Sequence, residues 1–182
     1  MHNLRISSHF DLFAKDLLAE RSFRPMIIVG ASKVDHLLLE ILEHFLLPKI
    51  ARKRDQDELL EGNSPLATFS ARTKVCRRLG LIDETLYSTL ERLRSLRNLN
   101  AHSISFDHTK SPVRDHIDEL RKLIHSRPSY KLTKKKYFEG RPFLAFEELQ
   151  CLLLTLCLLL QAIREKVVRT VGNKRALSIA AK

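Results

Sequence analysis

The spacing of apolar residues most constrains how this chain can fold. They recur every three or four positions along most of its length, which places them on one face of a helix. Leucine dominates the apolar content, tryptophan is absent, and the 182 residues include 5 Gly and 6 Pro, a balance that suits long helices better than short strands and tight turns. We therefore predict an all-α protein, a compact bundle of about six to seven helices. A chain of this length can bury one core, so we expect a single domain over residues 1–182.

Start and stop signals divide this pattern into separate helices. Gly80 is a predicted helix stop and Asp83 a predicted N-cap. Ser64-Pro65 and Ser111-Pro112 each place a capping residue before a first-turn proline, so a helix is expected to begin at each pair. The remaining helices are expected at about 9–20, 25–47, 84–100 and 144–170. Residues 103–111 are predicted to form a loop, 126–143 a basic connector and 171–182 a frayed basic tail.

Cysteine usage and the apolar runs indicate the compartment. Cys76, Cys151 and Cys157 form no CxxC pair, and two of them lie in a leucine-rich run, where cysteine behaves as a small buried residue. This favours a reducing environment. No signal-peptide pattern is found at the N-terminus, and the longest apolar run, CLLLTLCLLL at 151–160, is about half of what a bilayer requires. We expect a soluble cytoplasmic protein without membrane contact.

Net charge indicates the class of partner. The chain carries 32 Lys and Arg against 21 Asp and Glu, a formal net charge of +11, and such a field attracts polyanions before specific contacts form. RNA or DNA is the expected partner, although many soluble proteins are basic without binding either. In the connector, Tyr130, Tyr137 and Phe138 could stack on single-stranded bases or pin the segment to the bundle. The candidate nucleic-acid contacts there are Lys131, Lys134, Lys135, Lys136 and Arg141.

A polar cluster, RNLNAH at 97–102, closes the helix predicted at 84–100. Arg97 follows the apolar stripe at helical spacing, so its guanidinium should emerge beside the buried face. Asn98 and His102 share a face, whereas Arg97 and His102 are about 140° apart on an ideal helix. These two side chains can therefore converge only if the helix bends or ends between them, or if the arginine wraps round.

The cluster permits a catalytic and a structural interpretation. In the first, His102 takes the proton of a ribose 2′-OH, Arg97 holds the phosphate and Asn98 orients one of them, so that RNA is cut without a metal. In the second, Arg97 pairs with a carboxylate of a neighbouring helix, Asn100 stabilises the helix end and His102 bonds a terminal carbonyl. Spacing alone favours the structural interpretation.

Two longer stretches resemble the mannitol operon repressor family: LLEGNSPLATFSARTKVCRRLGLID at 59–83 and LERLRSLRNLNAH at 90–102. GASKVDHLLLEIL at 30–42 is similar to the family's helix that carries a buried Asp, so the resemblance covers about 25–105. The chain departs from the family pattern at Leu99, where an acidic residue is common, and at Asn100, where a large aromatic residue is common.

The resemblance implies both a fold and two alternative functions. The family belongs to the helical HEPN superfamily, whose signature is an arginine, a polar residue and a histidine, matched here by Arg97, Asn98 and His102. In catalytic members these residues meet across a dimer and cut RNA without a metal. The mannitol repressors share the fold but look like regulators rather than nucleases. The resemblance thus implies a homodimeric transcriptional regulator that binds nucleic acid or a protein partner, with a metal-independent endoribonuclease as the alternative.

Two further groups of residues are candidates for ligand binding. Arg72 is a further candidate nucleic-acid contact, because it lies one turn beyond Phe69 and could face the same pocket as Arg97 and help to clamp a phosphate. A salt bridge from Arg72 to Glu61 or Asp83 is nevertheless favoured. His36, Glu40 and His44 have the spacing of metal ligands, but HExxH is absent and the helix is expected to face the core. We therefore expect no metal and no cofactor.

Overall fold

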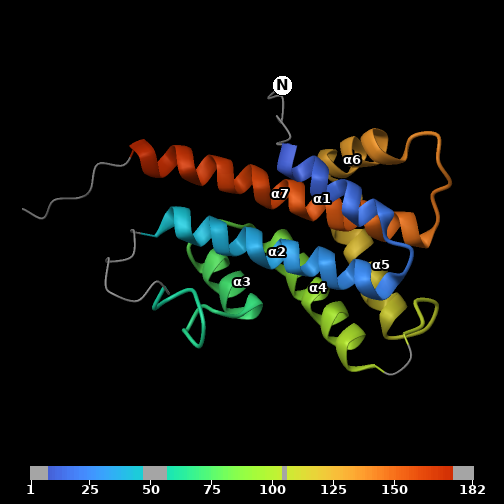
Figure 1. Cartoon of the computed structure of the whole chain (residues 1–182), viewed down its shortest axis with the longest axis horizontal. Coiled ribbons are helices and arrows are strands. Elements are labelled where there is room, and N and C mark those ends of the chain that lie inside the picture. The colour runs from blue at the N-terminus through green and yellow to red at the C-terminus, as the bar shows by residue number, and fades with distance from the viewer. Residues whose placement is uncertain (1–7, 47–56, 104–105, 174–182) are drawn as a thin grey trace, which may run out of the picture.

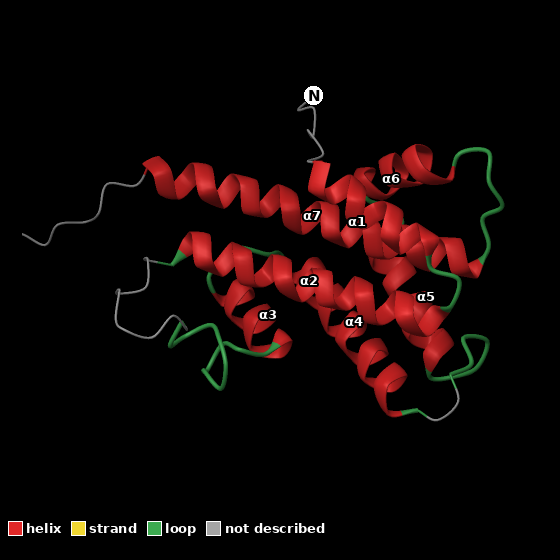
Figure 2. Ribbon diagram, in the orientation of Figure 1, coloured by secondary structure: helices red, strands yellow, loops and turns green. Residues whose placement is uncertain are grey.

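The structure, a computed structural model, describes residues 8–46, 57–103 and 106–173, with side chains described from Phe10 to Val167. These residues form seven α-helices and no strand, which confirms the all-α prediction (Figure 2). The helices are α1 (Ser8–Ala19), α2 (Phe23–Phe45), α3 (Phe69–Arg78), α4 (Glu84–His102), α5 (Val113–Ile124), α6 (Pro128–Phe138) and α7 (Ala145–Asn173).

The two longest helices, α2 and α7, form the centre of the bundle. They lie side by side and run in the same direction (Figure 1). At their crossing a Cβ on Gly30 would lie 2.8 Å from Leu153 Cδ1, so only glycine permits this approach without a shift of the leucine. α1 packs against both central helices, α3 and α4 pack against α2, and α5 and α6 pack against α7. α3, α4 and α2 are also in mutual contact, which creates the pocket described below.

α7 carries the largest share of the core. Its leucines Leu152, Leu153, Leu154 and Leu156 are completely buried. The segment Ala145–Val167 is long and apolar enough to cross a membrane, which differs from the expectation based on the shorter run at 151–160. More than half of its most apolar stretch is buried inside the bundle, as in the core helix of a soluble protein. Packing against α2, α5 and α6 thus explains the composition of this helix.

Most predicted helices agree with the structure within about two residues, the usual uncertainty of a helix end. Asp83 caps α4 as predicted, and its Oδ1 accepts a hydrogen bond from Leu86 N at 2.6 Å. The described residues between α4 and α5 form a loop, and α5 begins directly after the Ser111-Pro112 pair. Part of the predicted tail, 171–173, continues α7, and the rest of it lies outside the described residues.

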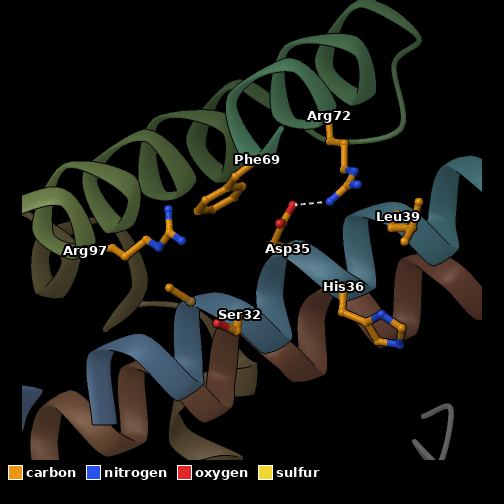
Figure 3. Close-up of a pocket in the computed structure, with 8 residues that line it drawn as sticks. Ser32, Asp35, His36, Leu39, Phe69, Arg72 and Arg97 are labelled. Carbon is orange, nitrogen blue, oxygen red and sulfur yellow. Dashed lines mark hydrogen bonds and ion pairs between the residues drawn. The ribbon is translucent and has the colours of Figure 1, made fainter. Parts of the chain in front are cut away.

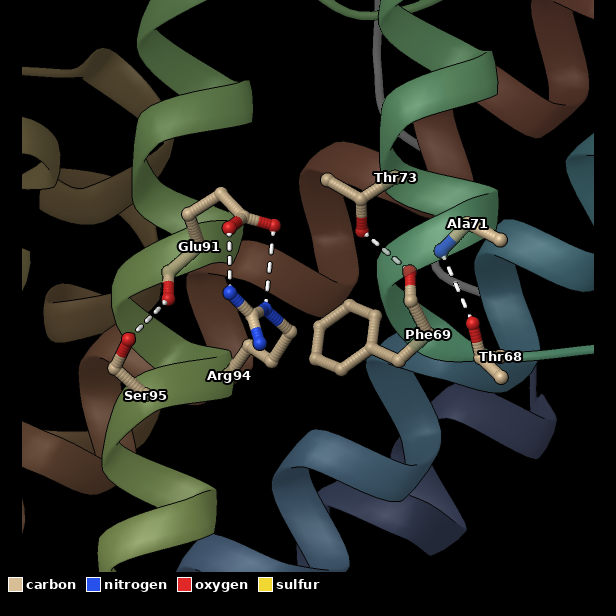
Figure 4. Close-up of polar contacts among 7 residues, drawn as sticks. All are labelled: Thr68, Phe69, Ala71, Thr73, Glu91, Arg94 and Ser95. Carbon is tan, nitrogen blue, oxygen red and sulfur yellow. Dashed lines mark hydrogen bonds and ion pairs between the residues drawn. The ribbon is translucent and has the colours of Figure 1, made fainter.

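The predicted helix start at Ser64-Pro65 is wrong. α3 begins at Phe69, and Thr68 is its N-cap: Thr68 Oγ1 accepts a hydrogen bond from Ala71 N at 3.2 Å (Figure 4). Ser64 instead donates its hydroxyl hydrogen to Leu59 O at 2.7 Å. Leu66 N donates to the same carbonyl oxygen at 3.0 Å, so these residues close a compact loop before the helix. Serine forms either arrangement, and the loop contacts select this one.

The predicted connector at 126–143 is also corrected, because its central part is helix α6. Pro128 occupies the first turn, where the missing N–H costs nothing. Tyr130, Thr133 and Phe138 are buried on the side that packs against α7. The aromatic residues therefore pin this segment to the bundle, and the lysines project from a helix rather than from a loop.

Candidate functional site

A pocket lies between α2, α3 and α4, on the side of α2 that faces away from α7 (Figure 3). It has a volume of about 190 Å³. α2 supplies Ala31, Ser32, Asp35, His36 and Leu39, α3 supplies Phe69 and Arg72, and α4 supplies Arg97. Residues from three separate segments thus meet in one cavity, and two of them are arginines.

Arg72 is held rigidly at the floor of this pocket. Only 8% of the residue is exposed, its Nη1 donates to Asp35 Oδ1 at 2.8 Å, and its Nη2 donates to Leu60 O at 3.0 Å. Its Nε is buried and makes no hydrogen bond within the described part of the chain. Arg72 therefore faces the same pocket as Arg97, as the sequence suggested. Its carboxylate partner is Asp35 rather than Glu61 or Asp83.

Arg97 enters the pocket from the opposite side, and Figure 3 shows the Phe69 ring between the two guanidinium groups. The side chain is exposed, and no described residue forms a hydrogen bond or ion pair with it. The structural interpretation, in which Arg97 pairs with a carboxylate on a neighbouring helix, is thus not found among the described residues. The lining of the pocket contains two guanidinium groups and one carboxylate, which is bonded to Arg72, so the pocket keeps an unbalanced positive charge.

His102 does not line the pocket that contains Arg97. α4 continues without interruption to His102, so the helix does not end between these residues. Both side chains are exposed, and at five residues apart they lie about 140° apart around the helix. Asn98 is partly buried and shares a face with His102. Within this chain the structure therefore brings Arg97 together with Arg72 and not with His102.

Asn100 anchors the C-terminal end of α4, as the structural interpretation of the cluster predicted, but its partner, Arg24, was not predicted. Asn100 is 2% exposed, its Nδ2 donates to Arg24 O at 2.9 Å, and its Oδ1 accepts from Arg24 Nε at 3.3 Å. Arg24 Nη2 donates to the carbonyl oxygens of Asn100, at 3.0 Å, and of Ser103. These bonds join the start of α2 to the unpaired carbonyls at the end of α4. Because 76 residues separate the partners, no local pattern could reveal the contact.

The lysines of α6 form a second candidate site. Lys131, Lys134 and Lys135 lie at i, i+3 and i+4 and are exposed; we call these three residues the basic face of α6. Lys134 also lies 4.0 Å from the centre of the Phe143 ring. Arg141, just beyond the helix, is exposed as well.

Lys136 differs from its neighbours, because its Nζ pairs with Asp11 Oδ1 at 3.0 Å. Tyr137 donates its hydroxyl hydrogen to the same oxygen at 3.0 Å. The hydrogen bonds from Lys136 and Tyr137 lower the pKa of the Asp11 carboxyl from its ordinary value, with the Lys136 bond as the largest cause. Lys136 is therefore committed to an internal contact, although it is exposed like the basic face.

His36 and His44 on α2 contact Glu40 of the same helix, and Glu40 also pairs with Arg164 of α7 at 3.3 Å. His36 Nε2 lies 3.5 Å from a carboxylate oxygen of Glu40, and His44 Nδ1 lies 2.6 Å from Glu40 O. Among the described residues, no three His, Cys, Asp or Glu side chains gather as metal ligands would. Burial raises the pKa of each of the three cysteines to about 12, so their thiols are inert at neutral pH.

No family model matches the sequence, and no curated protein matches it. The fold is a known class of all-α bundle. Solved structures similar to this chain include the following two. One is YggD from Shigella flexneri, described as a possible transcriptional regulator, with a TM-score of 0.59 and 14% identity over 87% of this chain and 98% of that chain. The other is a chain of the MtlR–HPr complex from Escherichia coli, with a TM-score of 0.56 and 20% identity over 89% of this chain and 99% of that one. The chain therefore has an MtlR-like fold.

Proposed function

We propose that the protein is a cytoplasmic regulator of transcription, a homodimer of the mannitol operon repressor kind with a HEPN-type bundle, that acts by binding nucleic acid. The observation that carries this proposal is the basic face of α6, where Lys131, Lys134 and Lys135 project together from a helix. The net charge of +11 and the fold shared with YggD and MtlR support it. Arg72 is not part of this interface, because it is buried against Asp35.

Binding of this kind depends on phosphate contacts more than on base contacts. Lysine is a compact charge on a flexible stem, which suits it to a phosphate rather than to a particular base edge. Each phosphate that a lysine neutralises releases condensed counterions, so that affinity falls as salt concentration rises. Arg141 lies near enough in sequence to extend the contact beyond the end of α6. We therefore expect strong dependence on salt and modest dependence on sequence.

The experiment compares two neighbouring lysines of equal charge. Lys135→Gln removes a side chain of the basic face, whereas Lys136→Gln removes one already paired with Asp11. Fluorescence anisotropy with labelled duplex DNA and with single-stranded RNA, repeated over a salt series, yields the slope of log affinity against log salt. For duplex DNA, Lys135→Gln should reduce the slope by about 0.9, the contribution of one phosphate contact, and Lys136→Gln should leave it unchanged. Equal slopes for both variants would refute the interface.

A protein partner is the second mode of regulation that we propose. MtlR was solved in complex with HPr, and its fold is shared by 89% of this chain. Arg97 and the pocket beside it are exposed, so a protein partner could dock there. The full chain is purified by affinity from its own cells, and the Arg97→Ala variant is purified in the same way for comparison. The native chain should co-purify with a partner protein, and the variant should recover less of that partner.

Metal-independent RNA cleavage remains the alternative function, favoured by the exposure of Arg97 and His102 on one helix. Because they diverge within a subunit, cleavage would require a second copy to complete the site. In EDTA, His102→Ala and Arg97→Ala should each abolish the formation of cyclic phosphate ends on labelled RNA, and Asn98→Ala should reduce it. His125→Ala is the matched control, since His125 is also exposed at a helix end. Activity retained by His102→Ala would eliminate this function.

A further inference from the structure

We propose that the pocket between α2, α3 and α4 is a binding site for a small organic carboxylate, which Arg97 recognises. The site is separate from the basic face of α6 and therefore goes beyond the proposed nucleic-acid interface, although a protein partner that docked beside Arg97 would cover the same pocket. It would give the protein a small-molecule effector. The ligand class follows from the charge balance, the volume and the lining of the pocket.

The charge balance favours a monoanion. Arg72 and Asp35 are joined at 2.8 Å and neutralise one another, which leaves the guanidinium of Arg97 as the unbalanced charge. A carboxylate would bring the pocket to neutrality and could accept two parallel hydrogen bonds from the planar guanidinium. A phosphate dianion would leave one excess negative charge beside the Asp35 carboxylate, which opposes its binding.

The positions of the two arginines suit different roles. Arg72 is buried and bonded to Leu60 O as well as to Asp35, so it cannot move to meet a ligand. Arg97 is exposed and forms no ion pair with a described residue, so its guanidinium can reorient and its charge is available. Arg72 thus shapes the floor and orients Asp35, while Arg97 makes the contact.

The volume and lining limit the size of the ligand. The pocket volume of about 190 Å³ is similar to that of a cavity of about 150 Å³ that binds benzene, so a short-chain or single-ring acid fits. Ala31, Leu39 and Phe69 are the apolar residues of the lining, against which such a body can pack. Ser32 is exposed at the pocket and supplies a hydroxyl that can donate a hydrogen bond to a carboxylate oxygen. A ligand held by both Arg97 and Ser32 would connect α4 to α2.

The experiment titrates the full chain with 4-fluorobenzoate and follows the fluorine NMR line width, with butyrate and inorganic phosphate as competitors at matched ionic strength. The native protein should bind the probe saturably, and Arg97→Gln should weaken binding about ten- to hundred-fold, because a charge-assisted contact is lost. Lys135→Gln removes the same charge from α6 and should bind the probe as the native protein does. Butyrate should displace the probe, and phosphate at pH 8 should displace it poorly.

A second variant separates loss of binding from loss of folding. Ser32→Asp keeps both arginines and places a negative charge at an exposed position of the pocket, so it should abolish probe binding while the helical circular dichroism spectrum is retained. Arg97→Gln that binds the probe as tightly as the native protein would overturn the proposal. So would the absence of saturable binding to the native chain. Displacement by phosphate as effective as that by butyrate would overturn the assignment of a carboxylate.

Discussion

Replacement of Asn100 by alanine tests the joint between α2 and α4. The change removes the amide that donates to Arg24 O at 2.9 Å and accepts from Arg24 Nε at 3.3 Å. The neutral bond contributes about 1 kcal/mol and the bond from the charged guanidinium about 1.5 kcal/mol. The higher helix propensity of alanine offsets about 0.5 kcal/mol of this loss in the free energy of unfolding. The free energy of unfolding should therefore fall by about 2 kcal/mol.

Asn98→Ala is the matched control, because Asn98 lies on the same helix, is only partly buried and makes no hydrogen bond with a described residue. The two variants share the change in propensity, so the difference between them isolates the contacts with Arg24. For a domain of this size, 2 kcal/mol corresponds to about 4–8 °C in Tm, which circular dichroism melting and urea unfolding can resolve. Indistinguishable melting temperatures for the two variants would refute the assignment of Asn100 as the anchor of the α4 terminus.

Three further predictions concern the core and the helix ends. Gly30→Ala should lower the free energy of unfolding by about 1 kcal/mol, because its Cβ would lie 2.8 Å from Leu153 Cδ1 and overpacking outweighs the gain in helix propensity; Leu153→Val should then cost less in that variant than in the native protein, as measured by urea unfolding. Thr68→Ala should lower thermal stability by about 1 kcal/mol through loss of the α3 cap, and Ser64→Ala by less, in calorimetry. The cysteines should react with Ellman's reagent at pH 8 only after unfolding. Because folding raises their pKa values from 9.0 to about 12, the folded state retains protons that the unfolded chain releases. The free energy of unfolding should therefore decline as pH rises above about 9.

Prediction from sequence succeeded where the cause is local and failed where two local signals compete. Asp83 was recognised as the cap of α4 because the cap and the first turn are adjacent in the chain. Ser64 and Thr68 are both competent caps, and the choice between them depends on loop contacts with Leu59. α6 was missed because its lysines and the flanking proline and glycine resemble a connector. Its buried positions can be recognised only when the packing of α6 against α7 is known.

The candidate site shows the same division. The spacing of Arg72 and Arg97 suggested that they share a pocket, and they do. The carboxylate partner of Arg72 was not predictable, because Asp35 lies 37 residues away in the sequence. The selection of Asp35 over Glu61 and Asp83 depends on how α3 crosses α2. The separation of Arg97 from His102 likewise required the knowledge that α4 does not end between them.

The sequence by itself determined that this protein is an all-α bundle, because apolar periodicity and capping act over a few residues and survive in any helical packing. Only the tertiary structure decided which charges are neutralised and which remain available. Asp35 pairs with Arg72, Asn100 with Arg24 and Asp11 with Lys136, while Arg97 keeps its charge beside a cavity. The physical reason is that an ion pair or a hydrogen bond requires two groups within a few ångströms, and the crossing of distant helices sets that distance.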